Sequence, residues 1–106
     1  MRAALVVLTA LLVVGCTGQP RTEPTPAADP VAACIALCQE ALAEDRDLSP
    51  GPCLSDSVMP DWVCDVTHSP RDPIDNIAEN QCAAFRSGAA HHFVEVDQSC
   101  ALIQKW

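Results

Sequence analysis

Several residue types on which enzymes and nucleic-acid-binding proteins depend are scarce in this chain of 106 residues. It has no tyrosine, two tryptophans, two phenylalanines and four glycines. With so few glycines the chain has no phosphate-cradling glycine pattern, and it also lacks a Gly-x-Ser-x-Gly nucleophile motif. Six Lys and Arg side chains stand against fourteen Asp and Glu, which gives a net charge of −8. The sequence therefore predicts neither a catalytic motif nor a basic surface for nucleic acid.

Apolar side chains are also scarcer in the folded part than the composition suggests. The length allows one small domain. Hydrophobic residues make up 49% of the chain, but 13 of them lie within residues 1–16. The aromatic residues of the remainder are Trp62, Phe85, Phe93 and Trp106. A core this small needs covalent support to be stable.

The first residues have the pattern of an export signal. One positive charge, Arg2, precedes an apolar run from Ala3 to Val14 that only Thr9 interrupts. This run is too short to span a bilayer core, which takes roughly 20 apolar residues. It fits the apolar region of a secretory signal peptide, which is typically about 7–15 residues long.

The end of this run, residues 12–16 (LVVGC), resembles the lipobox of prokaryotic lipoproteins. The resemblance implies that residues 1–15 are a signal peptide and that Cys16 becomes the mature N-terminus. It also implies that the Cys16 thiol carries a diacylglyceryl group, which would anchor the protein to the outward, extracytoplasmic face of the cell membrane. An ordinary secretory signal with an incidental cysteine is one alternative, and an N-terminal helix of the domain is another.

Residues 16–30 are then expected to form the lipidated anchor and a tether. Four of the nine prolines lie in residues 17–30, together with threonines and without any large apolar side chain. Such a segment is extended and semi-rigid, and it could hold the domain up to roughly 40 Å from the membrane. A loop packed on the domain is the alternative. Because residues 31–106 carry twelve acidic and four basic side chains, contact with an anionic membrane would depend on the lipid.

Six cysteines remain in residues 31–106 once Cys16 is assigned to the lipid: Cys34, Cys38, Cys53, Cys64, Cys82 and Cys100. An even number in a short exported domain predicts a disulfide framework. The pairs that we predict are Cys34–Cys64, Cys38–Cys53 and Cys82–Cys100. Structural zinc is the alternative, but only Cys34 and Cys38 approach the spacing of a ligand pair, and a redox Cys-x-x-Cys is absent.

The hydrophobic pattern predicts a small disulfide-stapled α+β domain over residues 31–106, with two helices on a three-stranded antiparallel sheet. Helices are predicted over residues 30–45, with Asp29 as N-cap, and over 77–87, with Asn76 and Glu79 as a capping box and a stop at Gly88. Strands are predicted over residues 62–66, 91–96 and 101–105, with a turn at 97–99 and mostly loop at 46–61.

Histidine and carboxylate side chains give a second hypothesis, a small metal-binding protein or metal-dependent enzyme. Its ligands would be His68 and Asp65 with His91 or His92, because imidazole and carboxylate bind transition metals. His91 and His92 point to opposite faces of a strand, so only one of them could meet His68. Ordinary packed or surface histidines are the alternative.

A polar cleft is a further expectation for the segment after the first predicted strand. Asp65 and His68 could line it together with Arg71 and Asp72. A carboxylate and an imidazole can perform general acid–base work, but no nucleophile motif accompanies them.

The first hypothesis is a membrane-anchored extracytoplasmic lipoprotein that acts as a small binding or interaction module and needs no cofactor. Its domain resembles short cysteine-rich lipoproteins of prokaryotes, archaea included, in residues 62–68 (WVCDVTH) and 92–97 (HFVEVD). That resemblance brings no catalytic residue with it. Either a protein or a small molecule could be the ligand.

Overall fold

The computed structural model describes residues 10–16, 18 and 28–106. Much of the predicted signal peptide and tether falls outside the described residues, in the segments 1–9, 17 and 19–27. Residues 10–16 are exposed and have no regular secondary structure, and the Cys16 thiol is free. Within the described ranges, no helix is both long and apolar enough to cross a membrane.

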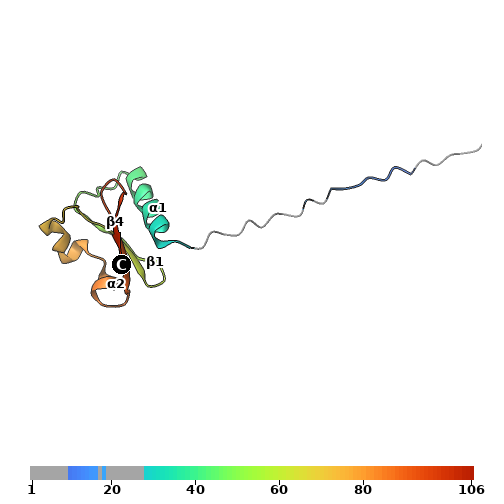
Figure 1. Ribbon diagram of the computed structural model, residues 1–106. Coiled ribbons are helices and arrows are strands. Elements are labelled where there is room, and N and C mark those ends of the chain that lie inside the picture. The colour runs from blue at the N-terminus through green and yellow to red at the C-terminus, as the bar shows by residue number, and fades with distance from the viewer. Residues whose placement is uncertain (1–9, 17, 19–27) are drawn as a thin grey trace, which may run out of the picture.

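The domain is α+β, as predicted, and its sheet has four strands (Figure 1). Its elements in chain order are α1 (Pro30–Ala43), β1 (Cys53–Met59), β2 (Trp62–Val66), the 3-10 helices η1 (Pro73–Asn76) and η2 (Ala78–Asn80), α2 (Ala83–Arg86), β3 (His92–Val96) and β4 (Leu102–Lys105). The strand order is β1-β2-β3-β4, with β2 and β3 parallel and the two outer pairs antiparallel. The prediction of three antiparallel strands is therefore wrong in strand number and in one strand direction.

The missed strand is β1, which lies in the stretch predicted as loop. Its sequence, CLSDSVM, places polar side chains in the middle of the strand, and its register with β2 shifts twice. An irregular edge strand of this kind shows no clean alternation of apolar and polar residues. The parallel pairing of β2 with β3 has a separate cause, because residues 67–91 between them are long enough for a crossover connection.

The first helix begins where the sequence predicts. Asp29 adopts an extended conformation, and its carboxylate accepts a hydrogen bond from the Val31 N–H at 3.0 Å. Pro30 occupies the first turn, where its missing N–H costs no hydrogen bond. The helix ends at Ala43, two residues early, because Asp45 adopts a left-handed conformation with φ of 56°.

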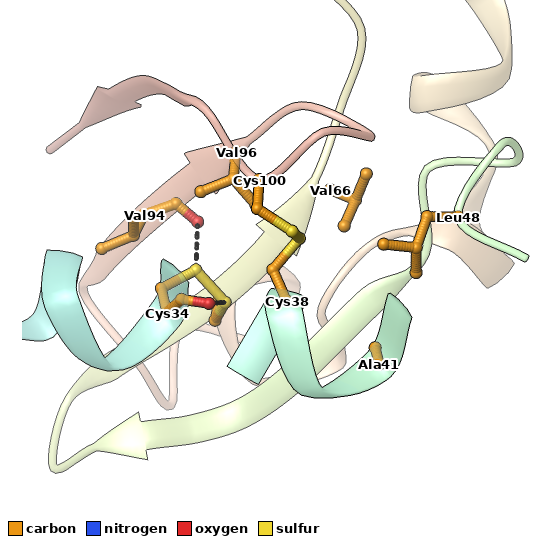
Figure 2. Close-up of a cluster of buried hydrophobic side chains, with 9 residues drawn as sticks. Cys34, Cys38, Ala41, Leu48, Val66, Val94, Val96 and Cys100 are labelled. Atoms are coloured by element: carbon orange, nitrogen blue, oxygen red, sulfur yellow. Dashed lines mark hydrogen bonds between the residues drawn. A yellow bond between two sulfur atoms is a disulfide. The ribbon is translucent and has the colours of Figure 1, made fainter. Parts of the chain in front are cut away.

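One face of the sheet packs against α1 and forms the larger core. Alternate residues of β2 and β3 point to this face, and its valines are fully buried (Figure 2). The buried members of this cluster are Cys34, Cys38, Ala41, Leu48, Cys64, Val66, Val94, Val96 and Cys100. Four of these nine are cysteines, so disulfide sulfur fills much of the space that large apolar side chains occupy in a bigger protein.

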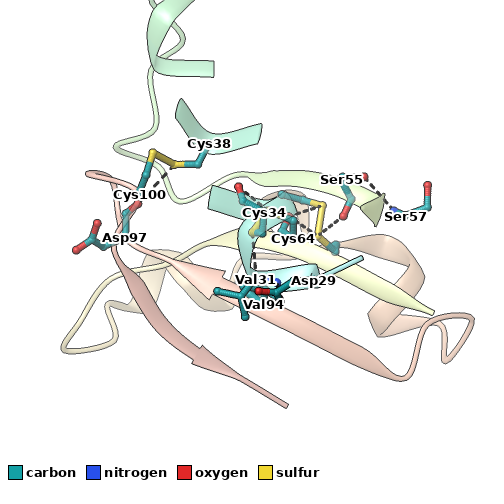
Figure 3. The surroundings of a disulfide bond; sticks show 12 residues. Asp29, Val31, Cys34, Cys38, Ser55, Ser57, Cys64, Val94, Asp97 and Cys100 are labelled. Atoms are coloured by element: carbon teal, nitrogen blue, oxygen red, sulfur yellow. Dashed lines mark hydrogen bonds between the residues drawn. A yellow bond between two sulfur atoms is a disulfide. The ribbon is translucent and has the colours of Figure 1, made fainter. Parts of the chain in front are cut away.

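Three disulfides join the elements, which confirms the predicted framework of six cysteines. The Cys34–Cys64 pair is confirmed and links α1 to β2 (Figure 3). The other two predicted pairs are wrong, because the structure forms Cys38–Cys100 and Cys53–Cys82. The error follows from the missed strand: β1 carries Cys53 to the sheet face that lies opposite α1, beside Cys82 and away from Cys38.

The second predicted helix, over residues 77–87, is wrong as a continuous element. The segment holds η2 and the four-residue α2, and η1 precedes it. Asn76 and Glu79 do not form the capping box; Asp72 and Asp75 form one at the start of η1 instead. The helix was predicted to stop at Gly88, and α2 ends nearby, at Arg86. Gly88 has a φ of 79°, which a helix does not continue through.

Gly51 permits the close approach of the loop before β1 to the end of β2. It has a φ of 72°, and a Cβ at this position would lie 2.7 Å from Asp75 Oδ1 and 2.9 Å from the Val66 carbonyl oxygen. We expect Gly51→Ala to lower the free energy of unfolding by about 3 kcal/mol, through left-handed strain and steric overlap together. Urea unfolding monitored by tryptophan fluorescence measures the change.

Gly88→Ala is the matched control for this substitution. Gly88 has a φ of 79°, but nothing lies within 4 Å of the added Cβ. Only the conformational cost, about 1 kcal/mol, should appear there. Equal losses in the two variants would mean that the contacts of Gly51 with Asp75 and Val66 contribute nothing.

Candidate functional site

The sheet face opposite α1 brings two carboxyl groups side by side. The parallel register of β2 and β3 pairs Val63 with Phe93 and Asp65 with Glu95. Because side chains alternate along a strand, these four residues point away from the larger core. Two acidic residues thus lie in neighbouring positions of a sheet interior, where like charges are unfavourable unless a proton or a cation intervenes.

A pocket of about 340 Å³ lies over this face. Its apolar lining consists of Val63, Cys82, Phe85 and Phe93. Phe85 packs edge-on against Phe93 at 5.1 Å between ring centroids, and Trp106 stacks beside Phe93 at 6.1 Å. The volume falls at the lower end of the range of roughly 300–1,000 Å³ that is usual for small-molecule sites.

The polar lining of the pocket is richer in positive charge than the rest of the domain. It comprises Asp65, Glu95, Gln81, Arg71 and Arg86. Residues 31–106 contain only four basic side chains, and two of these four line this one pocket. A wall of apolar side chains with a few convergent charged groups is the usual composition of a ligand site.

Among the groups that line this pocket, Asp65 has both a buried oxygen without a hydrogen bond and a strongly raised pKa. Its Oδ1 atom is buried and has no hydrogen-bond partner. Burial and the neighbouring charge of Glu95 raise the pKa of Asp65 to about 7, although Arg71 partly opposes this shift. A buried acceptor without a donor is costly, and such a group in a pocket is a candidate for ligand contact.

Glu95, in contrast, already has partners on both of its oxygens. Oε2 accepts a hydrogen bond from Gln104 Nε2 at 2.8 Å, and Oε1 lies 3.5 Å from a terminal nitrogen of Arg71. The Arg71 side chain is half exposed, and its Nε also donates to Asn76 at 3.1 Å. These contacts hold Glu95 in place and leave Asp65 as the unsatisfied member of the pair.

His68, the first predicted metal ligand, belongs to a different arrangement. Its Nδ1 lies 2.8 Å from Asp75 Oδ1, and its Nε2 lies 3.0 Å from the Ser49 carbonyl oxygen. The hydrogen bond and charge of Asp75 raise the pKa of His68 above 6.5. Burial alone would raise the pKa of Asp75, but the Asp72 N–H and the His68 ring and N–H lower it below 3.8. With both ring nitrogens occupied, His68 offers no free lone pair to a metal.

His91 and His92 lie at the other end of the sheet. Asp61, in the turn between β1 and β2, accepts hydrogen bonds from the His91 N–H at 2.9 Å and from its Nδ1 at 2.7 Å. His92 stacks on Trp62 with 4.7 Å between ring centroids. These contacts fix the start of β3 against the β1–β2 turn, which is a structural role.

The structure therefore does not assemble the predicted set of His68 and Asp65 with His91 or His92. His92 pairs with Trp62 at the start of β2, whereas His68 follows the end of that strand, so at least four strand residues, roughly 13 Å, separate them. Across the described ranges, the one cluster with metal-ligand spacing is Cys53, Asp56 and Cys82. Its two cysteines are joined in a disulfide, so they present no thiolate to a metal.

The predicted polar cleft of Asp65, His68, Arg71 and Asp72 is divided between two depressions. Asp65 and Arg71 line the 340 Å³ pocket. His68 and Asp72 line a wider and more open one of about 520 Å³, which has no large apolar wall. Asp65 thus has no imidazole beside it for the predicted acid–base pairing.

Sequence reasoning missed Arg86 and Phe85 as members of the site with Asp65, and it did not pair Glu95 with Asp65. The strand pattern of residues 91–96 placed Glu95 on a sheet face, but only the parallel register sets it beside Asp65. Comparisons of the chain with protein-family models, with curated proteins and with solved structures found no match. The function must therefore be argued from this chain's own residues.

The His68–Asp75 pair gives a testable pH dependence. A raised histidine pKa stabilises the fold at pH values where the ring is protonated, and that contribution is lost as the pH rises through the folded-state pKa. We expect His68→Gln to lower the free energy of unfolding by about 1 kcal/mol at pH 5.5 and by clearly less at pH 9. Urea unfolding at both pH values measures the gap, and a gap that widens toward pH 9 would contradict the assignment.

Proposed function

We propose that this protein is a lipid-anchored extracytoplasmic binding protein whose disulfide-braced domain holds a small ligand in the pocket lined by Asp65, Glu95, Arg71, Arg86 and Phe85. The observation that carries the proposal is a pocket with apolar walls in which the adjacent carboxyl groups of Asp65 and Glu95 meet two of the four basic side chains of residues 31–106. Like charges side by side in a partly buried site are unfavourable without a counter-charge. A ligand that carries a positive charge would relieve this repulsion.

The anchoring part of the proposal is supported by the first sixteen residues. They combine a short apolar run with a lipobox-like sequence that ends at Cys16. Cys16 is exposed and unpaired, while the other six cysteines form three disulfides. Disulfides persist in oxidising compartments, so this framework is compatible with export.

A fragment panel tests the binding part. The lipidated full-length mature protein, reconstituted in lipid nanodiscs, is heated with neutral, cationic, anionic and zwitterionic compounds of about 8–15 heavy atoms, sizes suited to a pocket at the small end of the usual range. A ligand that binds the folded state raises the melting temperature in proportion to RT ln(1 + [L]/Kd). We expect at least one charge class to raise it reproducibly.

Two substitutions locate the binding. Phe85→Ala removes a wall of the pocket and should abolish the shift. Leu102→Ala, an equally apolar change at a half-exposed side chain of β4 outside the pocket lining, should leave it unchanged. A panel in which nothing binds, or a shift that survives Phe85→Ala, overturns the proposed pocket.

Cys16→Ser tests the anchor separately. Serine cannot form the thioether, so we expect the variant to appear in the soluble extracytoplasmic fraction or to accumulate as the uncleaved precursor. Membrane flotation followed by intact-mass analysis distinguishes the two forms and detects the added mass of the lipid on the unchanged protein. Full membrane retention of a cleaved Cys16→Ser protein would reject lipid anchoring.

A further inference from the structure

We infer that the ligand of this pocket is a small zwitterion in which an ammonium group, a carboxylate and an apolar body are joined, the chemical class of the apolar α-amino acids. The inference rests on the proposed binding function and adds the identity of the ligand class. Three independent features of the pocket lead to it, one for each part of such a molecule.

The carboxylate is indicated by the placement of positive charge. In a domain with twelve acidic and four basic side chains, Arg71 and Arg86 both line this pocket. Within the described part of the chain, Arg86 forms no ion pair, and Arg71 approaches Glu95 through one terminal nitrogen at 3.5 Å. Guanidinium groups bind carboxylates through two parallel hydrogen bonds, so Arg86 is free to hold one.

The ammonium group is indicated by Asp65. Its Oδ1 accepts no hydrogen bond, and Glu95 lies beside it in the neighbouring strand. A positively charged N–H donor at the accessible part of the Asp65 side chain would relieve the repulsion between the two carboxylates. A neutral donor would not relieve it.

The apolar body is indicated by the walls of the pocket. Val63 is fully buried below the cavity, and the rings of Phe85 and Phe93 meet edge to face at its side. Aromatic rings of this kind pack well against another ring or a branched aliphatic group. A cavity of about 340 Å³ accommodates one such side chain with its two charged groups.

The charge balance of the pocket favours a ligand with both charges over one with a single charge. Two carboxyl groups and two guanidinium groups line the cavity, so the ionised site is neutral in sum. A ligand with only a positive charge would give Arg86 no carboxylate to bind. A ligand with only a negative charge would give Asp65 no donor, and it would add negative charge beside Glu95. Asp65 is partly buried, so its charge is costly without a partner, whereas the exposed Arg86 gains from a carboxylate mainly through paired hydrogen bonds.

Three compounds with the same phenyl body separate these cases. L-phenylalanine carries both charges, 2-phenylethylamine only the ammonium and 3-phenylpropionate only the carboxylate. Isothermal titration of the lipidated protein in nanodiscs at pH 7.5 should give a Kd for L-phenylalanine at least tenfold below that of either analogue. Because the pKa of Asp65 is raised to about 7, the approach of an ammonium group should release part of a proton from the Asp65 carboxyl, and the measured binding enthalpy should then depend on the ionisation enthalpy of the buffer.

Two substitutions that remove charge but keep a polar side chain assign the contacts. Asp65→Asn should raise the Kd of L-phenylalanine and 2-phenylethylamine at least tenfold and abolish proton release, with little effect on 3-phenylpropionate. Arg86→Gln should weaken L-phenylalanine and 3-phenylpropionate by a similar factor and spare the amine. Asp45→Asn, at an exposed residue after α1, makes the same charge change as Asp65→Asn outside the pocket and should alter none of the three affinities.

The outcomes distinguish this inference from the function on which it rests. Equal or tighter binding of the amine or of the carboxylate alone would overturn the zwitterion and leave a binding pocket in place. The zwitterion would also be overturned if Asp65→Asn and Arg86→Gln both bound L-phenylalanine with unchanged affinity while Phe85→Ala abolished its binding. If none of the three compounds binds while another class from the fragment panel does, the ligand class is wrong. If nothing binds at all, the pocket itself is rejected.

Discussion

Replacing Cys34 and Cys64 together by alanine should lower the free energy of unfolding by about 4–5 kcal/mol, which is enough to unfold much of the protein at 37 °C. The chain-entropy part, for a separation of 30 residues, is about 3.5 kcal/mol. The rest is the loss of close packing, since both cysteines are fully buried in the core between α1 and the sheet (Figure 3). Urea unfolding of the oxidised protein measures the difference.

The Cys53–Cys82 bridge provides a matched control within the same chain. Its separation of 29 residues predicts nearly the same chain-entropy contribution. It lies in the smaller core, however, where Cys53 is half-buried. Replacing this pair by alanine should therefore cost about 3.5 kcal/mol, less than the loss at Cys34 and Cys64.

The order of the two losses is the informative result. A greater loss at Cys53 and Cys82 would show that the α1-facing core does not depend on its sulfur atoms. Losses below about 1 kcal/mol at both positions would contradict the view that a domain with four aromatic residues needs covalent support.

Features set by neighbouring residues could be predicted from the sequence. Asp29 caps α1 because its own carboxylate reaches the Val31 N–H. Residues 62–66 form a strand whose alternation is visible in the sequence. The even number of cysteines in residues 31–106 anticipated a closed framework, since it depends on counting and not on geometry.

Features set by distant residues could not be predicted in the same way. The direction of β3 relative to β2 is determined by the crossover through η1, η2 and α2, whose short helices leave no long periodic pattern. Since that direction was missed, so were the pairing of Asp65 with Glu95 and the position of Arg86 near both. The two wrong disulfides have a related origin, because the irregular edge strand β1 decides which face Cys53 occupies.

The candidate site thus depends on the pairing of β2 with β3. The two acidic residues that this pairing brings together should lower the free energy of unfolding. Asp65 and Glu95 were brought together by the same parallel pairing that buries Val63 and Val94. The hydrophobic contacts of these strands offset an electrostatic penalty at the adjacent position. Residues at binding sites often reduce stability in this way, and their replacement then stabilises the fold.

Asp65→Asn should accordingly make the protein more stable at alkaline pH. Burial and Glu95 raise the pKa of Asp65 from 3.8 to about 7, so the folded state holds a proton that the unfolded state releases. The contribution of Asp65 to the stability of the unchanged protein therefore falls as the pH rises from about 4 to 7 and then levels off. The shift of roughly three units corresponds to at most about 4 kcal/mol, and because Asp65 is only partly buried we expect about 2–3 kcal/mol.

The measurement is the free energy of unfolding of the two proteins at pH 4 and pH 8. The gap in favour of Asp65→Asn should grow by about 2–3 kcal/mol between these values, while other titrating groups cancel in the comparison. Asp45→Asn, at an exposed position, should show no such growth. A gap that stays constant would mean that Asp65 titrates alike in the folded and unfolded states, and the electrostatic strain assigned to the pocket would then be absent.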